Sequence, residues 1–381
     1  MMLRGWGFWG RVAVAGLVLA LGGCVPETSN TSTDGNVGVD PAAYPGERVR
    51  GEPNDTFNEP ITIVLNPANR GHLAGTISST ADVDVYVFKT LLPGDRVILD
   101  VGTSNNGLDA AVAVYDEGGR IAFENDDRSL SPMQIDPYLN QVVRRESLVY
   151  FLAVYRSPLA VNSRVGAYEV LVTVVPGGQV PAGEGQTVVL DFDGGSISLP
   201  ERTYTVGAFN TADISPLYSG MTAVVRSQVA ATVRDNYEGL SLDVRTVPGD
   251  TVPTGAVYST VLFGGTSPDA FGESQAIDSY NSNQDDQAIV FTGMFTPSQF
   301  GRVLTALELG TAVGNIASHE LGHLLGLNHV ADVDDVMDTT GDSSTLLRDV
   351  RFLNSPLHWT IAPLGTQDSF LLLLEALGGG W

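Results

Sequence analysis

Near the end of the chain the sequence reads His319-Glu320-Leu321-Gly322-His323-Leu324-Leu325-Gly326-Leu327-Asn328-His329, and much of the second half can be inferred from it. Residues 316–325 contain no proline and several good helix formers, so they predict a helix. One helical turn separates His319 from His323, and both side chains therefore project from the same face. Glu320 is turned by about 100° around the helix, which places it beside a metal held by the two histidines rather than on it.

The end of this helix supplies a third ligand. Gly326 is expected to end the helix, because glycine readily takes the left-handed conformation that reverses the chain. The reversal would bring His329 back toward His319 and His323. Three neutral imidazoles leave a fourth position of Zn²⁺ open to water, which is the mark of a catalytic zinc site. A zinc site kept without useful peptidase activity remains an alternative for the same residues.

A methionine follows at a short distance. Met337 lies eight residues after His329, within Asp335-Val336-Met337-Asp338-Thr339. The histidine motif and Met337 together resemble the metzincin zinc peptidases, in which such a methionine forms a Met-turn under the zinc. Thr339 stands where astacins and serralysins carry a tyrosine, so the resemblance is closer to the matrixins.

This resemblance implies a zinc-dependent metalloendopeptidase with an α/β (α+β) catalytic domain over residues 187–381. Peptide bonds would be hydrolysed by a zinc-activated water, with Glu320 as the general base. A peptide or protein substrate would pair its backbone with an edge strand, which we expect at residues 287–291. The order of segments around the motif agrees with such a domain: strands at 187–192, 242–247 and 287–291, a long helix at 218–237, and a C-terminal helical pattern at 363–377. The aspartates 332, 334 and 335 could bind calcium, but we favour a solvated acidic loop.

The first half has a different pattern. Five short β-branched and aromatic runs, bounded by turn residues, predict an antiparallel β-sandwich. The runs are 84–88, 95–101, 111–115, 148–154 and 168–174. With Glu52-Pro53-Asn54-Asp55 and Gly166-Ala167-Tyr168-Glu169-Val170, they resemble the bacterial pre-peptidase C-terminal (PPC) domain, a jelly-roll-like sandwich, over residues 50–175.

The same resemblance implies candidate residues for a calcium site. Some collagen-binding relatives hold Ca²⁺ through the Glu-Pro-Asn-Asp segment and a later aspartate. The matching positions are Glu52, Asn54, Asp55 and Asp82. A turn in which the Asn and Asp side chains satisfy the local backbone is an equally good interpretation.

The N-terminal segment predicts export. Arg4 and Arg11 precede an apolar run that is too short to span a bilayer, followed by Leu21-Gly22-Gly23-Cys24. This pattern resembles the lipobox of bacterial lipoproteins, whose cysteine is lipidated. We therefore expect a signal peptide at 1–23, a lipid anchor at Cys24 in the cell envelope (the outer membrane or the cell surface), and a flexible stalk at 24–49. An ordinary secretory signal, with release of the protein, is the alternative. A Pro- and Gly-rich linker at 176–186 would join the two folded domains.

Composition limits the partners. The net charge of −24 and pI near 4.3 argue against nucleic acid, which requires a basic surface. The competing hypothesis for function is a surface-binding or adhesion lipoprotein whose zinc domain is a scaffold. A metal-dependent hydrolase of non-peptide substrates is a third.

Overall fold

The structure is a computed structural model, which describes residues 52–89, 91–103, 107–130, 133–158, 160, 163–199, 202–252 and 254–380. The predicted signal peptide, Cys24 and the stalk lie outside these residues. The described chain forms two compact units: 52–181 together with Trp359–Gly365, and Ala182–His358 together with 366–380. Within the described ranges, none of the helices combines the length and the apolarity needed to cross a membrane.

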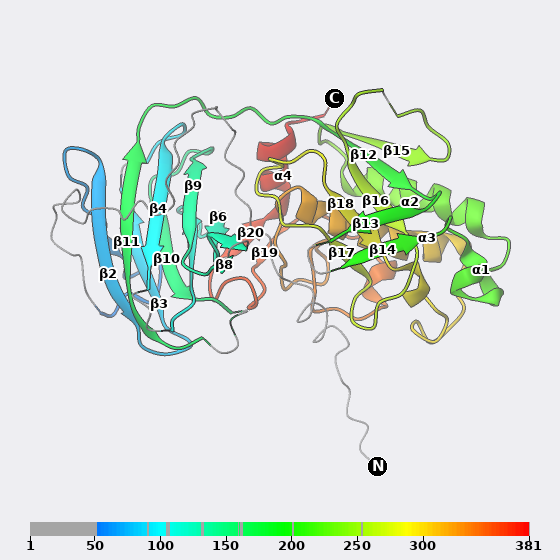
Figure 1. Cartoon of the computed structure of the whole chain (residues 1–381), viewed down its shortest axis with the longest axis horizontal. Helices are drawn as coiled ribbons and strands as arrows, with labels where there is room; N and C mark the ends of the chain where they lie inside the picture. Colours follow the sequence, from blue (N-terminus) through cyan, green and yellow to red (C-terminus); the bar gives the residue numbers. More distant parts are fainter. Residues whose placement is uncertain are drawn as a thin grey trace, which may run out of the picture. The chain divides into compact units, whose positions relative to one another are not determined.

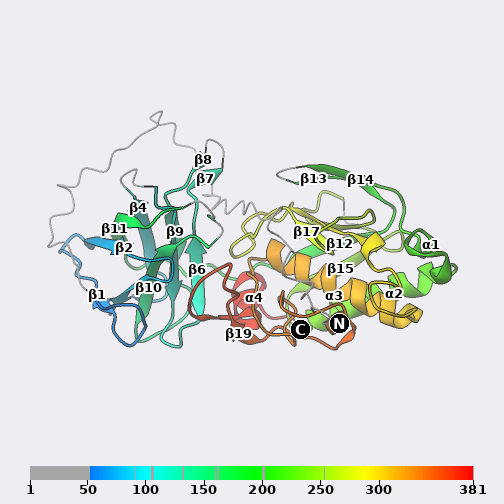
Figure 2. The ribbon, with the colours of Figure 1, turned by 90° about the horizontal axis from the view of Figure 1, so that it is seen from below.

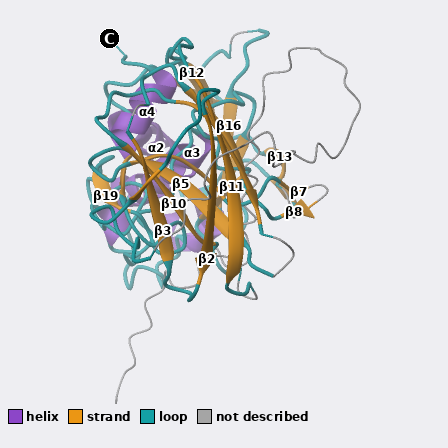
Figure 3. Cartoon of the chain, turned by 90° about the vertical axis from the view of Figure 1, so that its left-hand side faces the viewer, coloured by secondary structure: helices purple, strands orange, loops and turns teal. Residues whose placement is uncertain are grey.

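The first unit is built from strands (Figures 1 and 3). One sheet has the order β1-β3-β10-β5-β6 and the other the order β2-β11-β4-β9. All neighbouring strands in them are antiparallel except the pair β1–β3. The strands are β1 (Ile61–Thr62), β2 (Arg70–Ile77), β3 (Val83–Phe88), β4 (Arg96–Gly102), β5 (Ala110–Tyr115), β6 (Ile121–Asn125), β9 (Tyr138–Val142), β10 (Tyr150–Arg156) and β11 (Gly166–Val175), with a small hairpin of β7 (Ser129–Leu130) and β8 (Met133–Gln134). The five predicted runs are thus present as β3, β4, β5, β10 and β11.

The central strands β3, β5 and β10 are buried on both faces, unlike the half-exposed β4 and β11. Phe57 covers part of the outer face, with ring centroids 5.1 Å from Tyr115 and 4.9 Å from Phe151. The segment Trp359–Gly365 covers more of it. There, the hydroxyl of Tyr155 donates to the carbonyl of Ile361 at 3.2 Å. A segment from late in the sequence therefore belongs to this unit.

The second unit is an α/β layer. Its main sheet has the order β15-β12-β16-β18-β17, parallel except for β17. Figure 2 shows helices α2 and α3 on one face of this sheet and the β13–β14 hairpin on the other. The elements are β12 (Gln186–Asp191), β13 (Gly195–Ser198), β14 (Thr203–Val206), α1 (Thr211–Ile214), α2 (Thr222–Asn236), β15 (Leu242–Val247), β16 (Ser259–Phe263), β17 (Gly272–Ser274), β18 (Gln287–Val290), α3 (Ala306–Leu324), β19 (Asn354–Pro356), β20 (Thr366–Asp368) and α4 (Ser369–Leu377), with 3-10 turns at Pro216–Tyr218, Thr292–Met294 and Thr345–Leu347.

The prediction of the edge strand is wrong. Residues 287–291 contain β18, which lies between β16 and β17, so the edge strand on this side of the sheet is β17, and β15 forms the other edge. Its three residues, Gly272-Glu273-Ser274, lack the apolar alternation by which a strand is recognised. The edge of the sheet formed by β17 is therefore polar.

Helix α3 carries the histidine motif and is longer than predicted. It begins after a capping box in which Thr305 and Glu308 bond each other's backbone N–H groups. A Cβ on Gly310 would stand 2.4 Å from Cβ of Gln228, and one on Gly314 would stand 2.7 Å from Cβ of Thr232. These glycines let α2 approach closely, and the motif end of α3 is buried as a result.

Candidate metal and catalytic site

Three histidines meet at the end of α3. His319 and His323 lie one turn apart on the helix, and His329 returns to them after Gly326, which has φ +97°. One ligand nitrogen from each lies within 4.8 Å of the other two. The Nε2 atoms of His323 and His329 are 3.0 Å apart. Nitrogen atoms held at 2.0–2.1 Å by one tetrahedral zinc lie about 3.3 Å from each other, so the spacing fits a single ion.

Backbone carbonyls orient two of the rings. Nδ1 of His319 donates to the carbonyl of Val336, and Nδ1 of His323 donates to the carbonyl of Leu327, each at 2.8 Å. Because a carbonyl only accepts, the proton sits on Nδ1 and the Nε2 lone pair is free to bind a metal. The orientation of these ligands is thus built into the fold.

Burial keeps the three rings neutral. Loss of solvent lowers the pKa of His319, and it lowers that of His323 to about 3, with the neighbouring His319 adding to the effect. The pKa of His329 is also lowered, by burial and then by the charges of His323 and His319. Neutral imidazoles are the form that zinc requires. The donor set therefore fits Zn²⁺, with three nitrogen ligands and one position left over.

Glu320 follows His319 on α3 and lies against the edge strand β17. Only 6% of it is exposed. A Cβ on Gly272 of β17 would stand 2.5 Å from its Oε1. Burial raises the pKa of Glu320 well above its usual range, and the charge of Glu273 raises it further. A carboxyl beside the metal ligands is placed to accept a proton from a metal-bound water and to return it.

Met337 lies beneath the same helix. It is fully buried, and its Sδ would be 2.5 Å from a Cβ on Gly322. The backbone of its turn is bonded to the ligand loop, since Val330 N–H donates to the carbonyl of Met337 at 3.0 Å. The side chain of Met337 therefore packs against α3 at Gly322, within the stretch that carries the three histidines.

Asp335 was expected in a solvated acidic loop, and for this residue the expectation is wrong. It is 2% exposed, and its carboxylate accepts from Met337 N at 2.9 Å, Ser355 Oγ at 2.9 Å and Leu353 N at 3.1 Å. Burial raises its pKa to about 6. Asp335 joins the Met337 turn to the strand that follows, whereas Asp334 is exposed and pairs with Arg348 at 3.0 Å.

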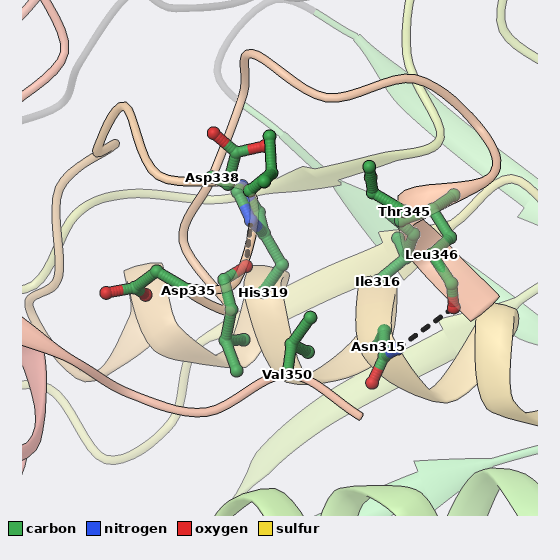
Figure 4. Close-up of a pocket in the computed structure, with 10 residues that line it drawn as sticks. Asn315, Ile316, His319, Asp335, Asp338, Thr345, Leu346 and Val350 are labelled. Atoms are coloured by element: carbon green, nitrogen blue, oxygen red, sulfur yellow. Dashed lines mark hydrogen bonds between the residues drawn. The ribbon is translucent and has the colours of Figure 1, made fainter. Parts of the chain in front are cut away.

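A small pocket opens behind His319, on the side of its Nδ1 (Figure 4). Its walls come from α3, the Met337 turn and the segment 345–350, and include Asn315, Ile316, Val333, Asp338, Leu346 and Val350. The amide of Asn315 donates to the carbonyl of Leu346 at 2.9 Å. This bond, with a second from the same amide to the carbonyl of Arg348 at 3.0 Å, holds the segment after Met337 against α3.

The predicted calcium residues come together only in part. Glu52, Asp82 and Asp84 place one oxygen each within 4.8 Å of one another. Asn54 is fully buried, and neither of its side-chain polar atoms has a hydrogen-bond partner among the described residues. Asp55 is exposed beside this group, and its pKa is raised by partial burial and then by the charge of Asp82.

Asp84 was missed by the sequence prediction because it alternates with the core residues of β3. Burial raises its pKa to about 6, while the hydroxyl of Tyr168 donates to it. Its place two residues after Asp82 was a usable signal, since side chains at i and i+2 of a strand share a face.

Comparison with known proteins gives no family assignment. No family model and no curated protein matches the sequence. Among solved structures, archaemetzincin from Methanopyrus kandleri is 15% identical over 52% of this chain and 98% of that chain, with a TM-score of 0.27. A zinc-dependent peptidase from Methanocorpusculum labreanum is 13% identical over 50% of this chain and 100% of that chain, with a TM-score of 0.26.

A third solved structure is similar over a smaller share of the chain. The pre-peptidase C-terminal domain of collagenase from Bacillus anthracis is 19% identical over 33% of this chain and 99% of that chain, with a TM-score of 0.22. These similarities are distant, so the assignment of the site depends on the geometry of His319, His323, His329 and Glu320. The chain has the residues of a zinc site with an adjacent buried carboxyl.

Proposed function

We propose that this chain is a zinc-dependent metalloendopeptidase of the metzincin type, closest to the matrixins. The proposal depends on one arrangement. Three neutral histidines converge within 4.8 Å, and Glu320, which follows the first of them on α3, lies against the edge strand β17. A structural zinc site would need four protein ligands and no base. A base at a sheet edge is what hydrolysis of an extended peptide needs.

The metal, Glu320 and the residues that support the ligands would have separate roles in hydrolysis. When bound, zinc would lower the pKa of a water and polarise the scissile carbonyl. Glu320 would take the proton from the attacking water and return it to the leaving amine. Burial of the site strengthens both electrostatic effects, because little solvent screens them. Met337 and the carbonyls of Val336 and Leu327 would hold the ligands in place.

A metal-dependence assay tests this proposal. Protein lacking residues 1–23 is incubated with a denatured protein after removal of metal, and again after zinc is restored. We expect no cleavage without metal and recovery with zinc. Cleavage that persists in chelator would contradict the role of zinc. No cleavage with zinc bound at one equivalent would contradict the proposal and favour the adhesion hypothesis.

We also propose export and lipid anchoring at Cys24. The support is the sequence alone: Arg4 and Arg11, an apolar run, and Leu21-Gly22-Gly23-Cys24. Cys24→Ser should move the protein from the membrane fraction to the soluble fraction in a bacterial host. Unchanged membrane association would rule out this anchor.

A calcium site in the β-sandwich is a second proposal. It is supported by the close oxygens of Glu52, Asp82 and Asp84 and by the unpartnered amide of Asn54, whose backbone carbonyl accepts from Val85 at 2.8 Å. Calcium prefers such oxygen ligands. It would also compensate the two buried carboxylates.

Calcium should raise the unfolding temperature of the wild type and of Glu146→Gln, an exposed charge elsewhere in the unit. It should have no such effect on Asp84→Asn. An equal shift in all three proteins would contradict the site.

A further inference from the structure

The edge strand β17 has one side that can pair with another chain. Phe291 N–H donates to the carbonyl of Phe271 at 2.7 Å, and Gln275 N–H donates to that of Gln287 at 2.9 Å. Between these bonds Glu273 stands opposite Ile289. Bonding alternates along an antiparallel ladder, so 271, 273 and 275 direct their backbone groups to β18. The N–H and C=O groups of Gly272 and Ser274 therefore point to the open edge.

The side chains of β17 alternate between the two faces of the sheet. The Cβ direction of Gly272 leads to Glu320 on α3. Glu273, one residue on, must project from the opposite face. On that face the hydroxyl of Tyr204, from β14, donates to Oε2 of Glu273 at 2.9 Å. Figure 2 shows the β13–β14 hairpin on this side of the sheet.

An extended peptide could pair with β17 as an additional antiparallel strand, in contact with both Gly272 and Glu273. Its hydrogen-bonded residues would lie opposite Gly272 and Ser274. The residue between them would face Glu273 in a non-hydrogen-bonded pair, with the two Cβ atoms about 4.5–5.5 Å apart on the same face. Because the two strands run in opposite directions, the substrate residue opposite Glu273 is immediately N-terminal to the substrate residue opposite Gly272. The side chain of that second residue lies on the face of Glu320.

We propose that Glu273 is a specificity-determining residue that selects a basic side chain, lysine or arginine, at this one substrate position. The inference rests on the proposed peptidase function and adds the substrate class to it. Opposite charges directly across an antiparallel pair attract, and like charges repel.

Three further observations bear on the charge. Tyr204 fixes the carboxylate of Glu273 without neutralising it. Arg202, with its guanidinium carbon 5.8 Å from the Tyr204 ring centroid, is a nearby cation that weakens the preference. The net charge of −24 also favours basic peptides over acidic ones on approach.

The test uses matched peptides. A single-bond substrate is first identified by mass spectrometry of a digested, denatured protein. Peptides with Lys, Gln or Glu at each position N-terminal to that bond are then compared by kcat/KM. We expect one position at which Lys exceeds Gln by about two- to five-fold, with the ratio falling as salt is raised.

Variants assign this ratio to Glu273. Glu273→Gln keeps an acceptor for Tyr204 and should bring the Lys/Gln ratio to about one, and Glu273→Lys should favour Glu. Arg202→Gln should enlarge the Lys/Gln ratio. Glu238→Gln makes the same charge change at an exposed site after α2 and should leave the ratio as in the wild type.

A structural role for Glu273 would lower kcat/KM for every peptide by the same factor and leave the ratio unchanged, which would overturn the inference. Cleavage by the wild type with no position preferring Lys would also overturn it, while the peptidase function stood. If no peptide is cleaved, both the function and this inference fail.

Discussion

The sulfur of Met337 occupies the space that a Cβ on Gly322 would fill, at a distance of 2.5 Å. Gly322 lies on α3 between Glu320 and His323, so the turn under the site and the ligand helix are in direct contact. Only glycine permits this approach.

Gly322→Ala should therefore disturb the site. Overpacking of a buried contact costs about 1–3 kcal/mol, of which the better helix propensity of alanine returns up to about 1 kcal/mol. We expect a net loss of about 1 kcal/mol in the free energy of unfolding and weaker zinc binding, measured by urea denaturation and metal competition. Gly207→Ala, whose Cβ meets nothing within 4 Å, is the control. Equal zinc affinity in the two variants would refute the contact.

Asp335→Ala should be more damaging than its position in an acidic loop suggests. The substitution leaves the donors of Met337, Leu353 and Ser355 without their acceptor. Each buried donor left unpaired costs about 1–3 kcal/mol, so we expect a loss of at least about 3 kcal/mol and poor zinc retention. Asp334→Ala removes only an exposed ion pair and should cost less than about 1 kcal/mol. Similar unfolding temperatures for the two variants would count against this role.

The stability of the second unit should fall as pH rises toward 8, in part through Asp286. This residue is 2% exposed, and burial raises its pKa to about 7. The folded state therefore holds a proton that the unfolded state releases near pH 4. Stability from this group is complete below pH 4 and is lost as pH rises through 7, by about 2 kcal/mol between pH 5.5 and 8.

Asp286→Asn should remove that part of the pH dependence in urea unfolding. Asp285→Asn, at the exposed neighbouring position, should retain it. A pH dependence that is unchanged in Asp286→Asn would show that its carboxyl is ionised in the fold.

The ligands of the site could be predicted because they are local. His319, His323 and Glu320 depend only on helical spacing, and His329 on one glycine turn. Asp84 and Asp335 could not be predicted in the same way, because their roles depend on burial and on partners distant in sequence. Asp335, for example, is bonded to Leu353 and Ser355.

The strands also divide into those that local sequence predicts and those that depend on distant partners. Apolar alternation predicted β3, β5 and β10 but missed β2, which contains Gly71 and Gly75. A Cβ on Gly75 would stand 2.3 Å from Oη of Tyr168, its pairing partner on the neighbouring strand β11, so a glycine is needed there to make room for the tyrosine. β17 was missed because three polar residues form a strand only by pairing with β18. The edge on which we propose that substrate binds was therefore assigned to the wrong segment.

The most direct test of the account is the activity of Glu320→Gln with zinc bound. The amide keeps the shape of the side chain but cannot take a proton, while His319, His323 and His329 are untouched. We predict one equivalent of zinc, an unfolding temperature close to that of the wild type, and a loss of at least about 100-fold in kcat/KM on a peptide substrate. Activity within a few-fold of the wild type at full zinc occupancy would contradict the proposed mechanism.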